Sequence, residues 1–159
     1  MKISMCLLAG VLAQAGAAGA QTFEVGIVGY GKAENFFEPL SGDLMVTRSG
    51  STIDRFDGLE GTPLNGMTAR CFGSTTILSG VANGNGNCVF TDPDGDKVLQ
   101  AWTVDEVGEG VAYGTWRFIG GTGRHEAIRG RGHFEQATVA VTGGKTTTIV
   151  GTATWPDPQ

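Results

Sequence analysis

Three carboxylates at alternate positions are the first candidates for metal chemistry in this sequence. They are Asp92, Asp94 and Asp96, in the run Asp-Pro-Asp-Gly-Asp. An EF-hand calcium loop starting at Asp92 would need glycine at its sixth position and glutamate at its twelfth, but these positions hold Lys97 and Thr103. Proline followed by glycine is instead typical of a tight turn between strands. We therefore predict a hairpin turn, without a metal or a cofactor; an oxygen-rich cation site of another kind is the alternative.

Acid–base catalysis would need one of the two histidines, His125 and His133. A general base must lie within hydrogen-bond reach of the proton that it removes, and no GxSxG, HExxH or Ser/His/Asp pattern surrounds either residue. We expect both side chains at the surface, His125 in a loop and His133 on the polar face of a strand. The catalytic residues, if the protein has any, stay unknown.

A glycine-rich stretch, Gly120-Gly121-Thr122-Gly123, could in principle cradle a phosphate. The sequence that follows completes neither a GxGxxG nor a GK[ST] motif, and no helix is expected after it. A tight turn between strands is the better interpretation.

Two cysteines, Cys71 and Cys88, remain once the N-terminal leader described below is set aside. Only one pairing is available to them, and an oxidising compartment favours a disulfide. Their 16 intervening residues suit neighbouring strands of a hairpin, and the crosslink would contribute ~3 kcal/mol in the chain-entropy model. A metal site would need more ligands, and a catalytic thiol would need a histidine or a CxxC partner close by.

The first 20 residues have the features of a secretory signal. Lys2 precedes an apolar run at 6–12, and small residues follow up to Ala18-Gly19-Ala20. The apolar run is too short to span a bilayer core of ~30 Å. Cleavage after Ala20 would leave residues 21–159, which suit a single domain. We therefore expect an exported protein, periplasmic or extracellular, with no membrane attachment after cleavage.

Charge and glycine content exclude several classes of protein. The net charge is −5, which opposes binding to nucleic acid or to anionic membranes. Glycine makes up about 17% of the residues after the leader, against a usual ~7%. Because glycine costs roughly 1 kcal/mol inside a helix, a helical bundle is disfavoured. The sequence leaves the oligomeric state open, and a homo-oligomer is among the states we consider.

Short alternating segments separated by turn residues predict an all-β fold. The expected turns include residues 84–87, 93–95 and 143–144, and residues 33–40 are expected to form a loop. The expected strands, eight or nine in number, are 22–30, 42–47, 52–56, 67–74, 75–81 merging into 87–91, 98–104, 112–119, 128–139 and 146–155.

Strand spacing near ten residues is typical of barrels and sandwiches. We favour an eight-stranded antiparallel barrel over a β-sandwich, because glycines within strands permit the bends that closure requires. Alternation within the strands places four aromatic side chains on inward faces. These candidates for the wall of a lumen are Trp102, Trp116, Phe118 and Phe134.

Residues 88–134 carry a family resemblance. A Gly-Thr-Trp strand at 114–116, a Gly-Gly-Thr-Gly turn at 120–123 and a Gly-x-Gly strand at 130–132 resemble a pattern in small exported bacterial proteins of unassigned role. The turn also resembles that of the allene oxide cyclase and dirigent barrels. This resemblance implies an eight-stranded antiparallel barrel with an apolar cavity, which in those families holds a hydrophobic or phenolic guest. No active-site residue of those families has a counterpart here.

Three functions stay open on the sequence. The first is an exported barrel that binds a small apolar or amphipathic molecule in its lumen, and this is the one we favour. The second is a cyclase or isomerase that positions a hydrophobic guest, which an ionisable residue buried at the bottom of the lumen would favour. The third is a structural or interaction barrel whose interior is solid, which the absence of a cavity would favour.

Overall fold

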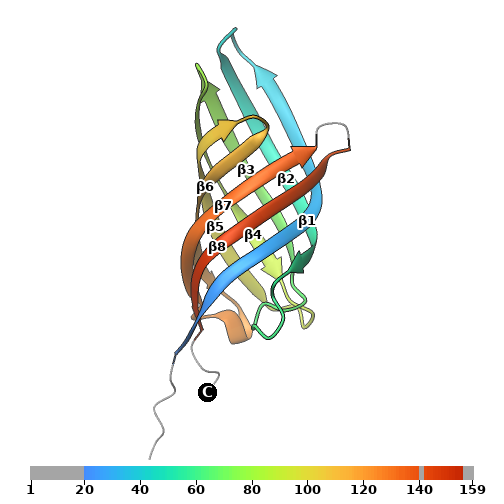
Figure 1. Ribbon diagram of the computed structural model, residues 1–159, viewed down its shortest axis with the longest axis vertical. Coiled ribbons are helices and arrows are strands. Elements are labelled where there is room, and N and C mark those ends of the chain that lie inside the picture. Colours follow the sequence, from blue (N-terminus) through green and yellow to red (C-terminus); the bar gives the residue numbers. More distant parts are fainter. Residues whose placement is uncertain (1–19, 140–141, 156–159) are drawn as a thin grey trace, which may run out of the picture.

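Eight antiparallel strands close into a single barrel (Figure 1). The computed structural model describes residues 20–139 and 142–155; the expected signal peptide lies outside them except for Ala20. Each strand pairs with the next, and β8 pairs with β1 to complete the barrel. The elements are β1 (Gln21–Pro39), β2 (Leu44–Asp57), β3 (Thr68–Leu78), β4 (Val81–Thr91), β5 (Lys97–Gly108), β6 (Val111–Gly121), the 3-10 helix η1 (Gly123–His125), β7 (Arg129–Val139) and β8 (Gly144–Trp155). The predicted barrel is confirmed, and the sandwich is excluded.

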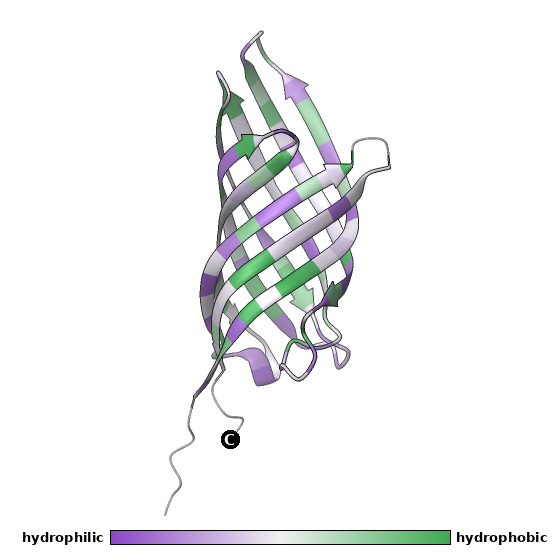
Figure 2. Cartoon of the chain, in the orientation of Figure 1, coloured by the Kyte–Doolittle hydropathy of each residue, from purple (hydrophilic) through white to green (hydrophobic). Residues whose placement is uncertain are grey.

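Alternation of side chains along the strands accounts for the closure. Figure 2 shows hydrophobic and hydrophilic residues following one another along the strands that face the viewer. In β6, for example, Trp116 and Phe118 are buried, while Arg117 and Ile119 between and beyond them are exposed. The inward positions of all strands together form the core. No helix in the described ranges is long and apolar enough to cross a bilayer.

Several strands are longer than the sequence indicated. Residues 33–39, expected to form a loop, continue β1 and pair with β2. The two segments expected at 42–47 and 52–56 are a single strand, and β3 runs past residue 74 to Leu78 before a turn at Ser79 and Gly80. Backbone pairing with a neighbouring strand satisfies the N–H and C=O groups of these residues, and so it outweighs the turn preference of the glycine, serine and proline within them.

The expected turn at 84–87 is also wrong, because these residues lie inside β4. Gly86 faces inward, and a Cβ atom there would collide with the indole ring of Trp102 and with the backbone of Phe72. Gly84 stands against Thr75 in the same way. These glycines therefore allow close packing across the sheet rather than a reversal of the chain.

The two ends of the barrel differ in construction. The β2–β3 loop and η1 cover one end, where β8 also finishes (Figure 1). Four apolar side chains there are at most 2% exposed: Leu59, Leu64, Met67 and Ile128. We call this the closed end. The hairpin turns after β1, β3 and β5 lie at the opposite, open end, where β7 also ends and β8 begins.

An ionic network holds the loops of the closed end together. Asp92 is buried, and its Oδ1 accepts hydrogen bonds from the backbone N–H groups of Asp94 and Asp96, both at 2.9 Å. Its Oδ2 lies 2.6 Å from Nη2 of Arg124 and 2.9 Å from Nε2 of His125. The predicted turn at 93–95 is confirmed, and Asp92 closes it. Within the described residues, no cluster of three or more side chains could hold a metal ion.

His125 is fully buried, so its expected place at the surface is wrong. Its ring packs edge-on against Trp155 with the centroids 4.8 Å apart. The indole N–H of Trp155 donates to the backbone carbonyl of Arg124 at 2.9 Å. The β6–β7 loop therefore clamps the end of β8, and His125 serves the core rather than a catalytic site. His133 is exposed on β7, as expected.

Candidate functional site

The open half of the barrel encloses a cavity of about 440 Å³. All eight strands contribute side chains to its wall, and it extends to the hairpin residues Gly110, Val111 and Gly143 at the open end. Small-molecule sites typically have volumes of ~300–1,000 Å³. The lumen is therefore not filled by its own side chains, as the solid barrel would require.

The deep part of the cavity is largely apolar, with the buried Gln100 of β5 as a polar member of its lining. Ile53, Phe90, Trp116 and Ile149 line it, and all four are almost completely buried. The indole N–H of Trp116 donates to two backbone carbonyls, those of His133 and Val150, at 3.1 Å each. The ring is thus fixed from behind and presents a rigid apolar surface.

Three of the four aromatic residues predicted to line the lumen do contact the cavity: Trp102, Trp116 and Phe134. Phe118 points inward but does not line it. Its ring packs against Trp116 at 4.9 Å and edge-on against Phe90 at 6.2 Å, on the side of the closed end. Whether any of these residues binds a ligand stays a prediction.

The predicted disulfide is confirmed. Cys71 of β3 and Cys88 of β4 are directly paired in register, and their sulfur atoms are bonded. Both residues also belong to the cavity wall. The crosslink ties two strands where the lumen is hollow and the side chains there have fewer partners.

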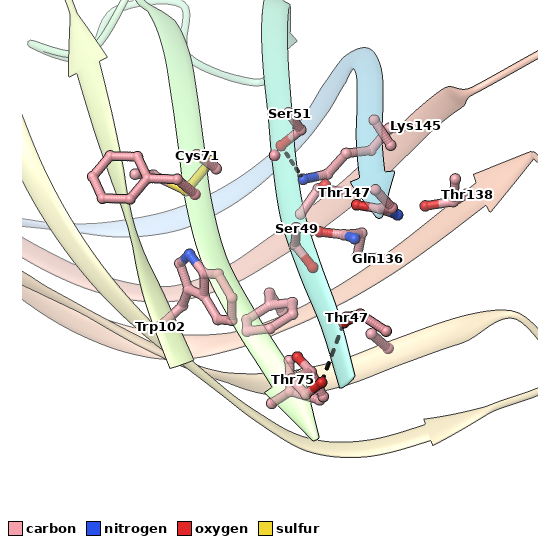
Figure 3. A pocket seen from close by; sticks show the side chains of 18 of the residues that line it. Thr47, Ser49, Ser51, Cys71, Thr75, Trp102, Gln136, Thr138, Lys145 and Thr147 are labelled. Atoms are coloured by element: carbon pink, nitrogen blue, oxygen red, sulfur yellow. Dashed lines mark hydrogen bonds between the residues drawn. A yellow bond between two sulfur atoms is a disulfide. The ribbon is translucent and has the colours of Figure 1, made fainter. Parts of the chain in front are cut away.

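Polar side chains concentrate on one side of the cavity. Thr47, Ser51, Thr75 and Thr147 are buried there, and the hydroxyl of Thr47 donates to the carbonyl of Thr75 at 3.4 Å. Figure 3 shows these residues around the cavity together with Gln136 and Thr138. A lumen with an apolar floor and hydroxyl-bearing walls suits a guest that carries both kinds of surface.

Lys145 is the only ionisable residue among those that line the described cavity. It is 7% exposed, and its Nζ donates to Oγ of Ser51 at 2.7 Å (Figure 3). Lys145 pairs in register with Gly31 of β1, so its side chain crosses this strand to reach Ser51 on β2. Burial lowers the pKa of Lys145 from 10.5 to about 8, because the charged ammonium loses hydration.

Thr147 adds an unsatisfied group beside this amine. It lies two residues beyond Lys145 on the inward face of β8, and its buried hydroxyl has no hydrogen-bond partner. Buried hydroxyls without a partner are uncommon and costly in folded proteins. One wall of the lumen therefore offers an amine and two hydroxyls, from Lys145, Ser51 and Thr147, whose hydrogen-bonding capacity is not fully used.

The sequence analysis missed Lys145 because it placed the start of the last strand at residue 146. The signal was present in the period of two. Counting back from Trp155 in steps of two along β8 passes Ala153, Ile149 and Thr147 and arrives at Lys145. The glycines at 143 and 144 made the lysine look like a turn residue, which would have been exposed.

Comparison with known proteins finds likeness in structure alone. No family model matches the sequence, and no curated protein does. The barrel is similar to the pterocarpan synthase dirigent protein GePTS1, with 11% identity, a TM-score of 0.52, and coverage of 94% of this chain and 99% of that one. It is also similar to the pterocarpan synthase dirigent protein PsPTS1, with 12% identity, a TM-score of 0.51, and coverage of 87% and 97%. The chain therefore has the fold of the dirigent-like barrels that the sequence resemblance implied.

Proposed function

We propose that this protein is exported and binds a small amphipathic molecule in the lumen of its barrel. The observation that carries the proposal is the cavity of about 440 Å³, with an apolar floor and one polar wall. The leader and the disulfide support export, since disulfides persist in oxidising compartments. A buried apolar floor contributes affinity by removing guest surface from water, at roughly 25 cal/mol per Å².

A second function, that of a cyclase or isomerase acting on a hydrophobic guest, is favoured by one specific observation. Lys145 is an ionisable residue buried in the wall of the lumen, although it lies in the open half and not at the bottom, where such a group was expected from the sequence. Groups with perturbed pKa values in cavities are frequent at functional sites. The similar structures belong to proteins described as pterocarpan synthases, so the same fold also accommodates synthases.

The first test of the proposal is native mass spectrometry on protein taken from its own exported fraction. We expect an additional mass that denaturation releases, on a chain that starts at Gln21. A second measurement follows displacement of an environment-sensitive fluorescent probe from the purified barrel. Affinity for apolar probes is expected to depend on the free volume of the lumen.

A matched pair of variants connects that binding to the lumen. Gln136→Trp fills the cavity from β7, whereas Glu135→Trp places the same ring on the exposed face of the same strand. We expect the first variant to lose probe binding by tenfold or more, since roughly 1.4 kcal/mol of contact suffices for that factor, and the second to bind as wild type. Equal binding by both variants would place the probe outside the lumen and contradict the proposal.

A further inference from the structure

We propose that Lys145 captures a carbonyl compound as a reversible imine, so that the guests of the lumen include small amphipathic aldehydes or ketones. The inference rests on the proposed function, because the carbonyl compound must enter the same cavity. It adds a substrate class and a covalent step to a site that would otherwise only hold a guest.

The surroundings of Nζ favour nucleophilic chemistry. The hydrogen-bond partner of the amine is a neutral hydroxyl, that of Ser51 at 2.7 Å, and no carboxylate lines the described cavity. From the neighbouring strands, Ala33 of β1, Ser51 of β2 and Thr138 of β7 occupy the adjacent wall, and none of these residues ionises. An ammonium ion here has lost its hydration without gaining an anion, so the equilibrium is shifted towards the neutral amine relative to a lysine in water.

The neutral form is the reactive one. With its pKa lowered by burial to about 8, Lys145 is neutral in roughly a tenth of molecules at pH 7, whereas an amine at the usual value is neutral in roughly one in three thousand. Lysines become nucleophiles in proteins largely by such desolvation.

The covalent step balances without a further reagent. The lone pair of Nζ forms a C–N bond to the carbonyl carbon, the π electrons move to the oxygen, and one N–H proton passes from nitrogen to that oxygen to give a neutral carbinolamine. The nitrogen lone pair then forms the C=N bond as the hydroxyl group leaves, and the second N–H proton departs with it as water. Addition of water reverses both stages and releases the carbonyl compound.

Two hydroxyls lie on the same wall of the cavity as Nζ. Ser51, in hydrogen-bond contact with Nζ, can relay the proton between nitrogen and oxygen. The unpartnered hydroxyl of Thr147 can donate to the carbonyl oxygen as negative charge develops on it. The remainder of the guest would lie against Trp116, Phe134 and Ile149. Ser51 and Thr147 thereby orient the reacting groups.

The chain provides its own internal controls for a trapping experiment. After the leader, its only lysines are Lys32, Lys97 and Lys145, and the first two are exposed. The disulfide-bonded protein is incubated with decanal and sodium cyanoborohydride, which reduces an imine to a stable secondary amine and spares disulfides. Peptide mass mapping then locates the decyl group.

We expect Lys145 to be labelled at least tenfold faster than Lys32 and Lys97 near neutral pH, with a rate that rises towards pH 8. Excess decanol should slow the labelling by competing for the lumen. Ser51→Ala should reduce the labelling rate at a saturating concentration of decanal, where a change in guest binding no longer contributes to the rate. Lys145→Arg keeps the charge but cannot form an imine. Lys145→Met is a second variant, in case the arginine variant does not fold. Both should abolish the labelling in the lumen.

The outcomes separate the two proposals. Binding of decanol without selective labelling of Lys145 would overturn the imine and leave the lumenal binding site standing. Labelling of all three lysines at equal rates would overturn it as well, since bulk aldehyde would then account for the reaction. Failure of both decanol and apolar probes to bind would contradict the proposed function itself.

Discussion

Asp92 at the closed end and Lys145 at the open end are both buried, and their surroundings compensate their charges to very different degrees. At the closed end, Asp92 accepts hydrogen bonds from two backbone N–H groups, and Arg124 and His125 both contact its Oδ2. At the open end, Lys145 has one neutral partner, Ser51, and a cavity beside it. A buried charge whose hydrogen bonds and ion pairs are all made is typical of a structural network, whereas a buried charge with few partners is typical of a functional site.

The pKa values of the two groups express the same contrast. Burial acts to raise the pKa of Asp92, but hydrogen bonds from His125 and Arg124 outweigh it and lower the pKa to about 2. Burial alone lowers the pKa of Lys145 to about 8. The folded protein thus favours the charged form of Asp92 and disfavours the charged form of Lys145. The first therefore stabilises the fold, and the second costs stability that a lumenal function would justify.

The largest effect is expected from Asp92→Ala. Removing the carboxylate leaves the buried His125 and two part-buried turn N–H groups without their acceptor, so unfolding should become easier by about 3–5 kcal/mol. Urea denaturation at pH 7, with the disulfide intact, measures this change. The matched control is Asp94→Ala in the same turn, whose exposed carboxylate lies 3.9 Å from Arg124 and should contribute under ~0.5 kcal/mol. Equal losses in both variants would mean that the network is not what holds the closed end.

At the open end, Lys145→Met should stabilise the protein at pH 7, by up to about 3 kcal/mol for a pKa lowered from 10.5 to about 8. Between these two pH values the unfolded wild-type chain binds more protons than the folded one, so wild-type stability rises with pH through this window. The advantage of the variant should therefore be complete below pH 8 and shrink as the pH approaches 10.5.

Denaturation curves at several pH values measure this trend. Lys32→Met on the exposed face of β1 is the control and should change stability by under ~0.5 kcal/mol. A destabilised Lys145→Met variant, or an advantage that does not vary with pH, would show that the lysine is well compensated. The proposed difference between a compensated Asp92 and an uncompensated Lys145 would then be wrong.

Most of the fold was predictable, because it depends on patterns within short segments. Alternation along each strand fixed the inward faces, and only Cys71 and Cys88 were left to pair after the leader. Strand length at the open end was harder. Pro39 and the neighbouring phenylalanines suggest a break in the chain, while pairing of β1 with β2 carries the strand through to Pro39.

The contacts of the buried side chains Asp92 and Lys145 could not be predicted from the sequence, for a different reason. Asp92 and His125 are 33 residues apart, and nothing local indicates that barrel closure brings them together. Lys145 and Ser51 are 94 residues apart and meet only because β8 pairs with β1. Contacts of this kind depend on register across several strands, and register is set by the whole barrel.

The smallest effect is expected from a substitution that tests how tightly the wall of the open half is packed. Gly86 packs against Trp102, which lines the cavity, and an added methyl group there would meet the indole of Trp102 and the backbone of Phe72. We expect Gly86→Ala to cost ~1–3 kcal/mol, since the backbone cannot move away, and to weaken probe binding as the indole shifts into the lumen. Gly26→Ala on β1 is the control, because nothing lies within 4 Å of its added methyl group. Both variants could instead have the same stability in urea while only Gly86→Ala loses probe binding. The indole of Trp102 would then have moved into the cavity without a cost in stability, and the wall of the open half would be more deformable than the closed end.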